Sequence, residues 1–290
     1  MTQLLDKPAR ALVVHLGGIG DFLLTCPAIE RLAEEGPVEL LGQPKRLDLA
    51  VAAGIAVAAH DMDRVDFQSI FSEPNGRLRD LLRGFDRCIV WIRDDGAIAR
   101  NVRQCGVEDV RVFPGLPPKD WATHASRYYL DCLGMKDAPP LRLSIEPTTV
   151  SHDALIHPGS GGAHKNWPLE RFISLANALE DQGRCVTWCL GPAEEGIPLP
   201  DGLDVLQTDS LVALARELAG TQLYVGNDSG ITHLAAALGC PTLAIYGPTD
   251  PRVWAPRGPQ VAVVQAAPWP EVEDVLHALD TQDLPNGPAP

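Results

Sequence analysis

Apolar and amphipathic segments alternate along almost the whole chain. Short apolar runs with the length of buried strands occur in the first half at 11–16, 38–42, 88–92 and 110–114. Helical segments are predicted between them, at 22–35 and 46–54 and, as a polar helix, at 77–83. Strands that alternate with helices in this way predict a mostly parallel sheet covered by helices.

The pattern breaks at 137–153, where three prolines interrupt a stretch without helical spacing, and then restarts. Further strands are predicted at 154–159, 185–191, 221–228 and 241–247, the last of these as the final strand. Further helices are predicted at 168–183, 211–220, 229–239 and 271–280. The sequence therefore predicts an α/β protein with two Rossmann-like domains, one at 1–145 and one at 146–290.

Composition restricts the class of protein. Of the 290 residues, 45% are hydrophobic and 21% are charged, as in globular proteins with a sizeable core. No apolar run reaches the ~18 residues that span a bilayer, and residues 1–10 lack the pattern of a secretory signal, so we expect a cytoplasmic protein. The seven cysteines contain no C-x-x-C pair and are expected to be reduced core thiols.

The net charge of −14 argues against nucleic acid as a partner. Residues 1–150 contain 18 Lys and Arg against 21 Asp and Glu, a net of −3, whereas residues 151–290 contain 6 against 17, a net of −11. Eight arginines lie between Arg77 and Arg111. They form either solvated helix faces or a surface that receives an anionic, phosphorylated acceptor.

The first candidate motif is GGIGD at 17–21, a glycine turn between a predicted strand and a predicted helix. Such a turn lets backbone N–H groups approach a ligand closely. Leu23 stands where the dinucleotide-binding pattern requires its last glycine, which argues against a dinucleotide site. Asp21 at the start of the helix either complements the helix dipole or acts as a general base.

The second motif is HPGSGGAHKNWPLERF at 157–172, a glycine-rich loop between a strand and a helix. Ser160, Gly161 and Gly162 can present backbone donors to phosphate oxygens, and Lys165 supplies a positive charge. Lys165 is one of only six cations in its half of the chain. The alternative is that Lys165 is an ordinary surface lysine.

The third motif is YVGNDSGITHLAAALGCPTLAIYGPTDP at 224–251. Asp228 or Ser229 can cap the helix that follows, whose amino terminus would lie at the carboxyl edge of the sheet. This positive end suits a pyrophosphate. His233 in the first turn either helps to hold the phosphate or sugar or is a buried hydrogen-bonding residue.

Together these segments resemble glycosyltransferase family 9, the bacterial ADP-heptose:lipopolysaccharide heptosyltransferases. The resemblance is carried by residues 20–29, 157–172 and 226–251. It implies the GT-B architecture, in which two Rossmann-like domains face each other across a cleft. The acceptor would bind to the amino-terminal domain and the nucleotide-sugar to the carboxy-terminal one.

By position, the resemblance also implies roles for individual residues. Asp21 would deprotonate the acceptor hydroxyl. Asp228 and His233 would line the donor pocket near the phosphate and the sugar. Glu194 would contact the ribose of the nucleotide, unless Glu195 takes this role. The residues implied in binding the donor diphosphate are Ser160, Gly161, Lys165, Ser229, Gly230 and Ile231.

The implied reaction is inverting transfer of a sugar, here heptose, from a donor such as ADP-heptose to a hydroxyl of a glycan or glycolipid acceptor of the lipopolysaccharide type. No cofactor is implied, and no metal is expected, because Lys165 and a helix amino terminus replace it and no D-x-D motif is present. Membrane contact would be at most peripheral, at the inner face of the cytoplasmic membrane. Two alternatives stay open: a GT-B-like sugar-nucleotide epimerase or hydrolase, and a non-catalytic nucleotide-sugar-binding protein.

Overall fold

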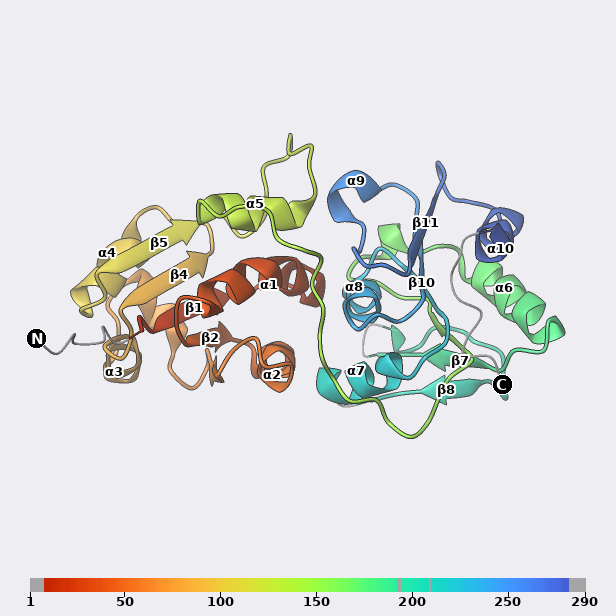
Figure 1. The fold of residues 1–290 in the computed structure, drawn as a ribbon, viewed down its shortest axis with the longest axis horizontal. Helices are drawn as coiled ribbons and strands as arrows, with labels where there is room; N and C mark the ends of the chain where they lie inside the picture. The colour runs from red at the N-terminus through yellow and green to blue at the C-terminus, as the bar shows by residue number, and fades with distance from the viewer. Residues whose placement is uncertain (1–7, 192–193, 209, 282–290) are drawn as a thin grey trace, which may run out of the picture. The chain divides into compact units, whose positions relative to one another are not determined.

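The computed structural model describes residues 8–191, 194–208 and 210–281, which form two compact units (Figure 1). The first unit comprises the chain up to Gly17, Leu24–Asp120 and Ser126–Ala138. The second unit comprises Gly18–Leu23, Trp121–Ala125 and the chain from Pro139 onward. The boundary predicted between 145 and 146 falls in the segment without helix or strand that follows Pro139.

The sheet of the first unit is parallel throughout, with strand order β3-β2-β1-β4-β5. Its strands are β1 (Ala11–His15), β2 (Val38–Gly42), β3 (Ala58–Asp61), β4 (Arg87–Trp91) and β5 (Asp109–Phe113). The helices that alternate with them are α1 (Ile19–Ala33), α2 (Pro44–Ala52), η1 (Phe67–Phe71, 3-10), α3 (Gly76–Leu82), α4 (Ala97–Gln104) and α5 (Ala125–Cys132). Every residue of β1 and β2 is buried, which explains why both read as continuous apolar runs rather than as alternating ones.

The second unit has its own parallel sheet, with strand order β11-β10-β9-β6-β7-β8. Its strands are β6 (Ala154–His157), β7 (Val186–Cys189), β8 (Asp204–Leu206), β9 (Tyr224–Asn227), β10 (Thr242–Tyr246) and β11 (Val261–Gln265). Its helices are η2 (Ala163–Lys165, 3-10), α6 (Leu169–Asp181), α7 (Leu211–Ala219), α8 (Gly230–Ala237), α9 (Pro251–Trp254) and α10 (Val272–Thr281). Two parallel α/β units confirm the predicted fold class.

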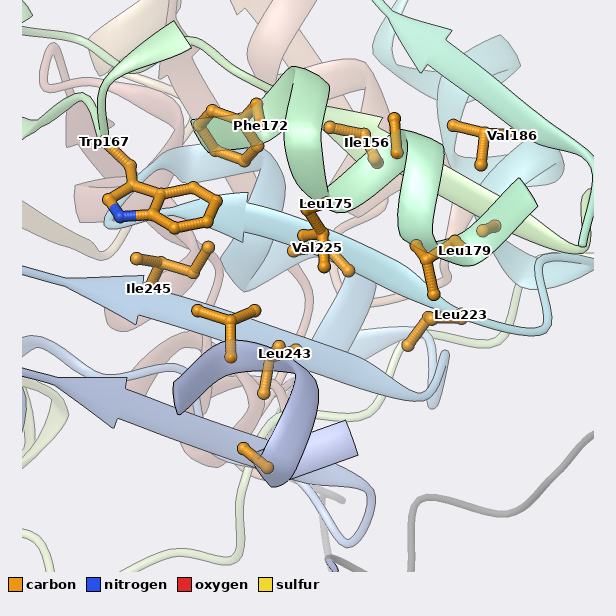
Figure 2. Close-up of a cluster of buried hydrophobic side chains, with 14 of the residues drawn as sticks. Ile156, Trp167, Phe172, Leu175, Leu179, Val186, Leu223, Val225, Leu243 and Ile245 are labelled. Atoms are coloured by element: carbon orange, nitrogen blue, oxygen red, sulfur yellow. The ribbon is translucent and has the colours of Figure 1, made fainter. Parts of the chain in front are cut away.

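The core of the second unit anchors the segment that follows the glycine-rich loop. Trp167 is 1% exposed and meets the ring of Phe172 edge to face, with the ring centroids 4.9 Å apart. Figure 2 shows both rings among aliphatic side chains of α6 and the sheet, with Ile245 of β10 on the other side of the indole. The indole Nε1–H donates to the backbone oxygen of Pro270 at 2.9 Å. Trp167 is therefore fixed on its apolar faces and at its polar atom.

Most predicted elements lie within two or three residues of the observed ones, but one prediction is wrong. The run at 241–247 is not the final strand, because β11 pairs with β10 at the edge of the sheet. Besides β11, several elements were not predicted at all, namely β3, β8, α4, α5, α9 and the two 3-10 turns η1 and η2. β8 has three residues that are exposed or half-buried, and no residue of β3 is buried, so neither strand has an apolar signal.

Candidate functional site

Two neighbouring strands of the second unit, β6 and β9, carry most of the predicted donor residues at their carboxyl ends, and Glu194 follows β7 on the other side of β6. β9 lies between β6 and β10 in the parallel sheet. The glycine-rich loop follows β6, Asp228 and Ser229 follow β9, and the segment that leads to α9 follows β10. The carboxyl edge of an open parallel sheet is where such folds bind their ligands. The fold therefore brings the second and third motifs to one place.

The glycine-rich loop is held by its own hydrogen bonds. Ser160 Oγ lies 2.6 Å from Asn166 Oδ1, and it accepts the N–H of Gly162 at 3.2 Å. The chain then forms the single 3-10 turn η2, which ends at Lys165. In this structure the Ser160 hydroxyl and the Gly162 amide thus satisfy each other, while Gly161 between them is exposed.

Lys165 is not an ordinary surface lysine, because its charge meets a buried carboxylate. Lys165 Nζ lies 2.8 Å from Asp228 Oδ2, with the lysine side chain 30% exposed and the Asp228 side chain 7% exposed. Tyr246 supports this pair from β10: its hydroxyl donates to Trp254 O at 2.7 Å and lies 3.5 Å from Asp228 Oδ1. Burial, together with Asp228, raises the pKa of Tyr246, so Tyr246 stays a neutral donor.

Helix α8 starts directly behind this ion pair. Ser229 is its N-cap, and the Ser229 hydroxyl accepts the N–H of Thr232 at 3.3 Å. Thr232 Oγ1 in turn donates to Asn227 O at 2.5 Å. Gly230 and Ile231, the first helical residues, are half-buried, whereas the rest of the helix is buried. The amino terminus of α8 is thus a rigid group of backbone dipoles beside a lysine.

His233 is buried and neutral. It is 8% exposed, and its backbone N–H donates to Ser229 O. Burial is the main cause that lowers the pKa of His233 to about 4; the Asp228 carboxylate opposes this effect, and His124 and Lys165 add to it. At neutral pH this imidazole carries no positive charge, and its ring also hydrogen-bonds the backbone of Trp254.

Glu194 lies beneath the glycine-rich loop. It is 4% exposed, and its Oε2 accepts the N–H of Gly191 at 2.7 Å and lies 3.7 Å from His157 Nε2. A Cβ at Gly159 would lie 1.6 Å from Glu194 Oε1, so only glycine fits there while the Glu194 side chain keeps this position. Burial raises the pKa of Glu194, but the His157 imidazole and the Gly191 amide outweigh burial and lower it. Glu194 is therefore an ionised carboxylate, whereas Glu195 is exposed.

Asp21 lies in the first turn of α1, where one of its oxygens accepts a backbone hydrogen bond. Asp21 Oδ2 accepts the N–H of Gly18 at 3.1 Å, and the residue is half-buried. This contact is the one expected of a carboxylate that complements a helix amino terminus. The assignment of Asp21 as a general base therefore stays a prediction that needs a chemical test.

Two polar residues of this region were not singled out from the sequence, namely Asn227 and Tyr246. Each is buried at the end of an apolar strand. A polar side chain that ends a buried strand must find partners, because an unsatisfied buried polar group is costly. That rule could have marked Asn227 and Tyr246, although it could not have named their partners.

The arginines between Arg77 and Arg111 are partly occupied by nearby acids. Arg79, Arg83, Arg87 and Arg111 pair with Glu73, Asp80, Glu35 and Asp109.

Among the residues that the structure describes, no group of three His, Cys, Asp or Glu side chains could hold a metal ion. Within the same described ranges, no helix has both the length and the apolar character to cross a membrane.

The chain is similar to lipopolysaccharide heptosyltransferases. Residues 142–277 match the model of glycosyltransferase family 9 (heptosyltransferase). Lipopolysaccharide heptosyltransferase 1 of Pseudomonas aeruginosa is 38% identical over 286 residues, which cover 83% of this chain and 79% of that protein. The namesake from Escherichia coli K12 is 37% identical over 111 residues, so the match spans about a third (35%) of that protein.

The fold agrees with this relationship. The solved structure described as E. coli ADP-heptose lps heptosyltransferase II superposes with a TM-score of 0.73 at 18% identity, covering 93% of this chain and 97% of that one. This likeness confirms the predicted GT-B class of fold. The family itself is shown by the identity over most of the chain. The chain belongs to glycosyltransferase family 9.

Proposed function

We propose that this protein is an inverting glycosyltransferase that transfers heptose from ADP-heptose to a hydroxyl of a lipopolysaccharide-type acceptor. The proposal is supported chiefly by one arrangement: a loop lysine and a buried aspartate meet at 2.8 Å at the amino terminus of α8. A helix amino terminus beside a cation is a site for a diphosphate. The relatives named as heptosyltransferases supply the sugar and the acceptor of the proposal.

In the proposed reaction the acceptor hydroxyl attacks the anomeric carbon as the bond to the diphosphate breaks. Asp21 takes the hydroxyl proton, so the new glycosidic bond forms without a charged oxygen. The leaving ADP gains negative charge, which Lys165 and the amides of residues 229–231 stabilise. These groups supply the charge that a metal would otherwise provide, and we expect activity to persist in EDTA.

The remaining donor residues have proposed contacts of their own. The Ser160 hydroxyl would exchange Asn166 for a phosphate oxygen, with the exposed Gly161 amide beside it. Glu194 would accept the ribose hydroxyls, and the free ring nitrogen of neutral His233 would accept a hydrogen bond from a sugar hydroxyl. Asp228 would keep Lys165 aligned before the donor arrives.

Replacement of Asp21 by Asn tests the proposed function most directly. We expect kcat to fall by about 10³-fold, because loss of a general base typically costs 10²–10⁴-fold. The affinity for ADP, measured by titration calorimetry, should stay within about twofold, since Asp21 is not assigned to the donor.

Asp274 provides a matched control for this variant. Its Oδ2 accepts the N–H of Glu271 at 2.9 Å in the first turn of α10, the same local contact that Asp21 makes to Gly18. The Asp274→Asn variant should keep full turnover. Equal losses in both variants, or unchanged turnover in Asp21→Asn, would refute the assignment of the base. Release of ADP from ADP-heptose at full rate without any acceptor would favour the hydrolase alternative.

A further inference from the structure

The side-chain amide of Asn227 joins both ends of the glycine-rich loop to the end of β9. Asn227 is fully buried, with 0% exposure. Its Nδ2 donates to Pro158 O at 2.7 Å, and its Oδ1 accepts the N–H of Trp167 at 2.9 Å. Because a carbonyl can only accept and a backbone N–H can only donate, these partners fix the orientation of the amide.

These two bonds close the loop that carries the proposed diphosphate ligands. Residues 158–167 start at Pro158, contain Ser160 and Lys165, and end at Trp167. The register of β6 on β9 pairs His157 with Gly226, so the loop begins directly beside Asn227. The end of the loop is fixed in the core through the indole of Trp167 (Figure 2). Asn227 therefore joins the two ends of the loop, whose interior is held by the Ser160 contacts to Gly162 and Asn166.

The same residue also connects the loop to the helix amino terminus. The backbone oxygen of Asn227 accepts the Thr232 hydroxyl in the first turn of α8. The next residue in the chain, Asp228, holds Lys165 through the 2.8 Å ion pair. Asn227 thus contacts the start of the loop, its end and the first turn of α8. All of these partners are groups of the protein, so Asn227 can act on the loop without contacting a ligand.

We propose that Asn227 is a positioning residue that holds the loop at 158–167 against the amino terminus of α8 in the geometry that binds a nucleoside diphosphate. This inference rests on the proposed function, because it assigns the diphosphate to that loop and helix. It adds a residue whose effect on donor affinity is exerted through Pro158 and Trp167.

A purely stabilising role for the amide would produce a different result, and the chain offers a matched case of such a role. Asn101 in the first unit is 3% exposed, and its Nδ2 donates to Ile70 O at 2.7 Å and to Ser72 O at 3.0 Å. Both asparagines therefore use one buried amide to hold backbone oxygens. They differ in that Asn227 holds the proposed donor loop.

The test compares the Asn227→Asp and Asn101→Asp variants in the full chain, with ADP as the probe in titration calorimetry. At about pH 8 the new carboxylate of Asn227→Asp faces the oxygen of Pro158, so the start of the loop is repelled. We expect ADP affinity about tenfold below that of the wild type, the size of one lost buried hydrogen bond.

Lower pH should restore binding in this variant. A carboxyl group beside a backbone oxygen has a raised pKa, and once protonated it donates the hydrogen bond that Nδ2 donated. At about pH 5.5 the affinity should recover to within about threefold of the wild type at the same pH. The ratio of variant to wild type is compared at each pH, because ADP and the site titrate in both proteins.

Asn101→Asp should lose stability at high pH in the same way while its ADP affinity stays equal to that of the wild type. Wild-type affinity in Asn227→Asp at about pH 8 would overturn the proposal, as would an equal loss in both variants. A loss of affinity that low pH does not reverse would also contradict it. If Asn227→Asp does not fold at high pH, Asn227→Ser replaces it and must show the same selective loss of ADP affinity. If the wild type itself bound no ADP, the proposed function would fall together with this inference.

Discussion

Charged side chains have different surroundings in the two units. In the arginine-rich stretch of the first unit, the ion pair of α3 lies at the surface: Arg83 and Asp80 are 65% and 76% exposed and their charged atoms are 3.4 Å apart. Arg87 is only 21% exposed, but its partners Glu35 and Asp109 are 53% and 36% exposed. In the second unit, Lys165 reaches a carboxylate that is 7% exposed, at 2.8 Å. The first unit has many more cations than the second, yet the second holds its one loop lysine in a defined position.

Under the proposed function, the number of cations does not by itself locate the anion site. An exposed arginine beside an exposed acid is screened by water and gains little from the pairing. A lysine fixed by a buried carboxylate has lost part of its hydration and most of its conformational freedom before a ligand arrives. Binding of a diphosphate to such a lysine therefore costs less side-chain entropy.

The largest expected effect that would sharpen this comparison is the loss of ADP binding in Lys165→Ala. We expect the Kd for ADP to rise by about 10–100-fold, because one charge-assisted contact is removed and buried Asp228 is left unpaired. Arg87→Ala is the control from the first unit, where Arg87 makes contacts of 2.6 and 2.7 Å to Glu35 and Asp109. Titration calorimetry should show unchanged ADP affinity in the control. A similar loss in both variants would break the comparison.

The pH dependence of stability compares one buried histidine from each unit, His15 and His233. Burial is the main cause that lowers the pKa of His15 and of His233 to about 4, with Arg46 adding to the shift at His15. In the unfolded chain these histidines take up a proton near pH 6.5, which the folded chain resists. Stability should therefore be complete above about pH 6.5 and fall towards pH 4, because the unfolded chain takes up protons that the folded chain does not.

Thermal unfolding between about pH 4.5 and 7 measures this dependence. Replacement of either histidine by Gln should make the melting temperature less dependent on pH. His15→Gln should act on the first unit and His233→Gln on the second, if the two unfold in separate calorimetric transitions. A pH dependence that is identical in the wild type and both variants would contradict the burial of neutral histidines.

The smallest effect is expected from the exposed ion pair of α3. Arg83→Ala removes a side chain that is 65% exposed and whose partner is three residues away. We expect the free energy of unfolding in urea to change by less than about 0.5 kcal/mol. A loss well above that value would mean that the arginines of the first unit are held as tightly as Lys165.

The sequence allowed most of the fold to be predicted, because buried strands and amphipathic helices leave strong periodic signals. Strands such as β1, β2 and β9 consist entirely of buried residues, and each was predicted within three residues of its observed bounds. β3 and β8 lack buried residues and were missed. β11, the strand at one edge of the second sheet, was also missed, although its residues are mostly apolar.

The candidate residues were also predicted from the sequence, as residue types in glycine-rich turns beside predicted helix starts. What the sequence could not supply was their partners. It offered Asp228 or Ser229 as the cap of α8; the structure assigns the cap to Ser229 and joins Asp228 to Lys165. It placed Glu194 in a loop, whereas the structure buries Glu194 under Gly159.

By itself, then, the sequence determined the two α/β units, the glycine-rich loop, its lysine and the start of α8. These features depend on the spacing of apolar residues and on the backbone conformations that glycine, serine and proline favour. Both are properties of residues close together in the sequence. Only the tertiary structure joined Lys165 to Asp228 and the two ends of the loop to Asn227. Those contacts link residues that are 63, 60 and 69 positions apart in the sequence, and they depend on β6 lying beside β9. Strand order follows from the packing of the whole sheet, so no local pattern in the sequence specifies it.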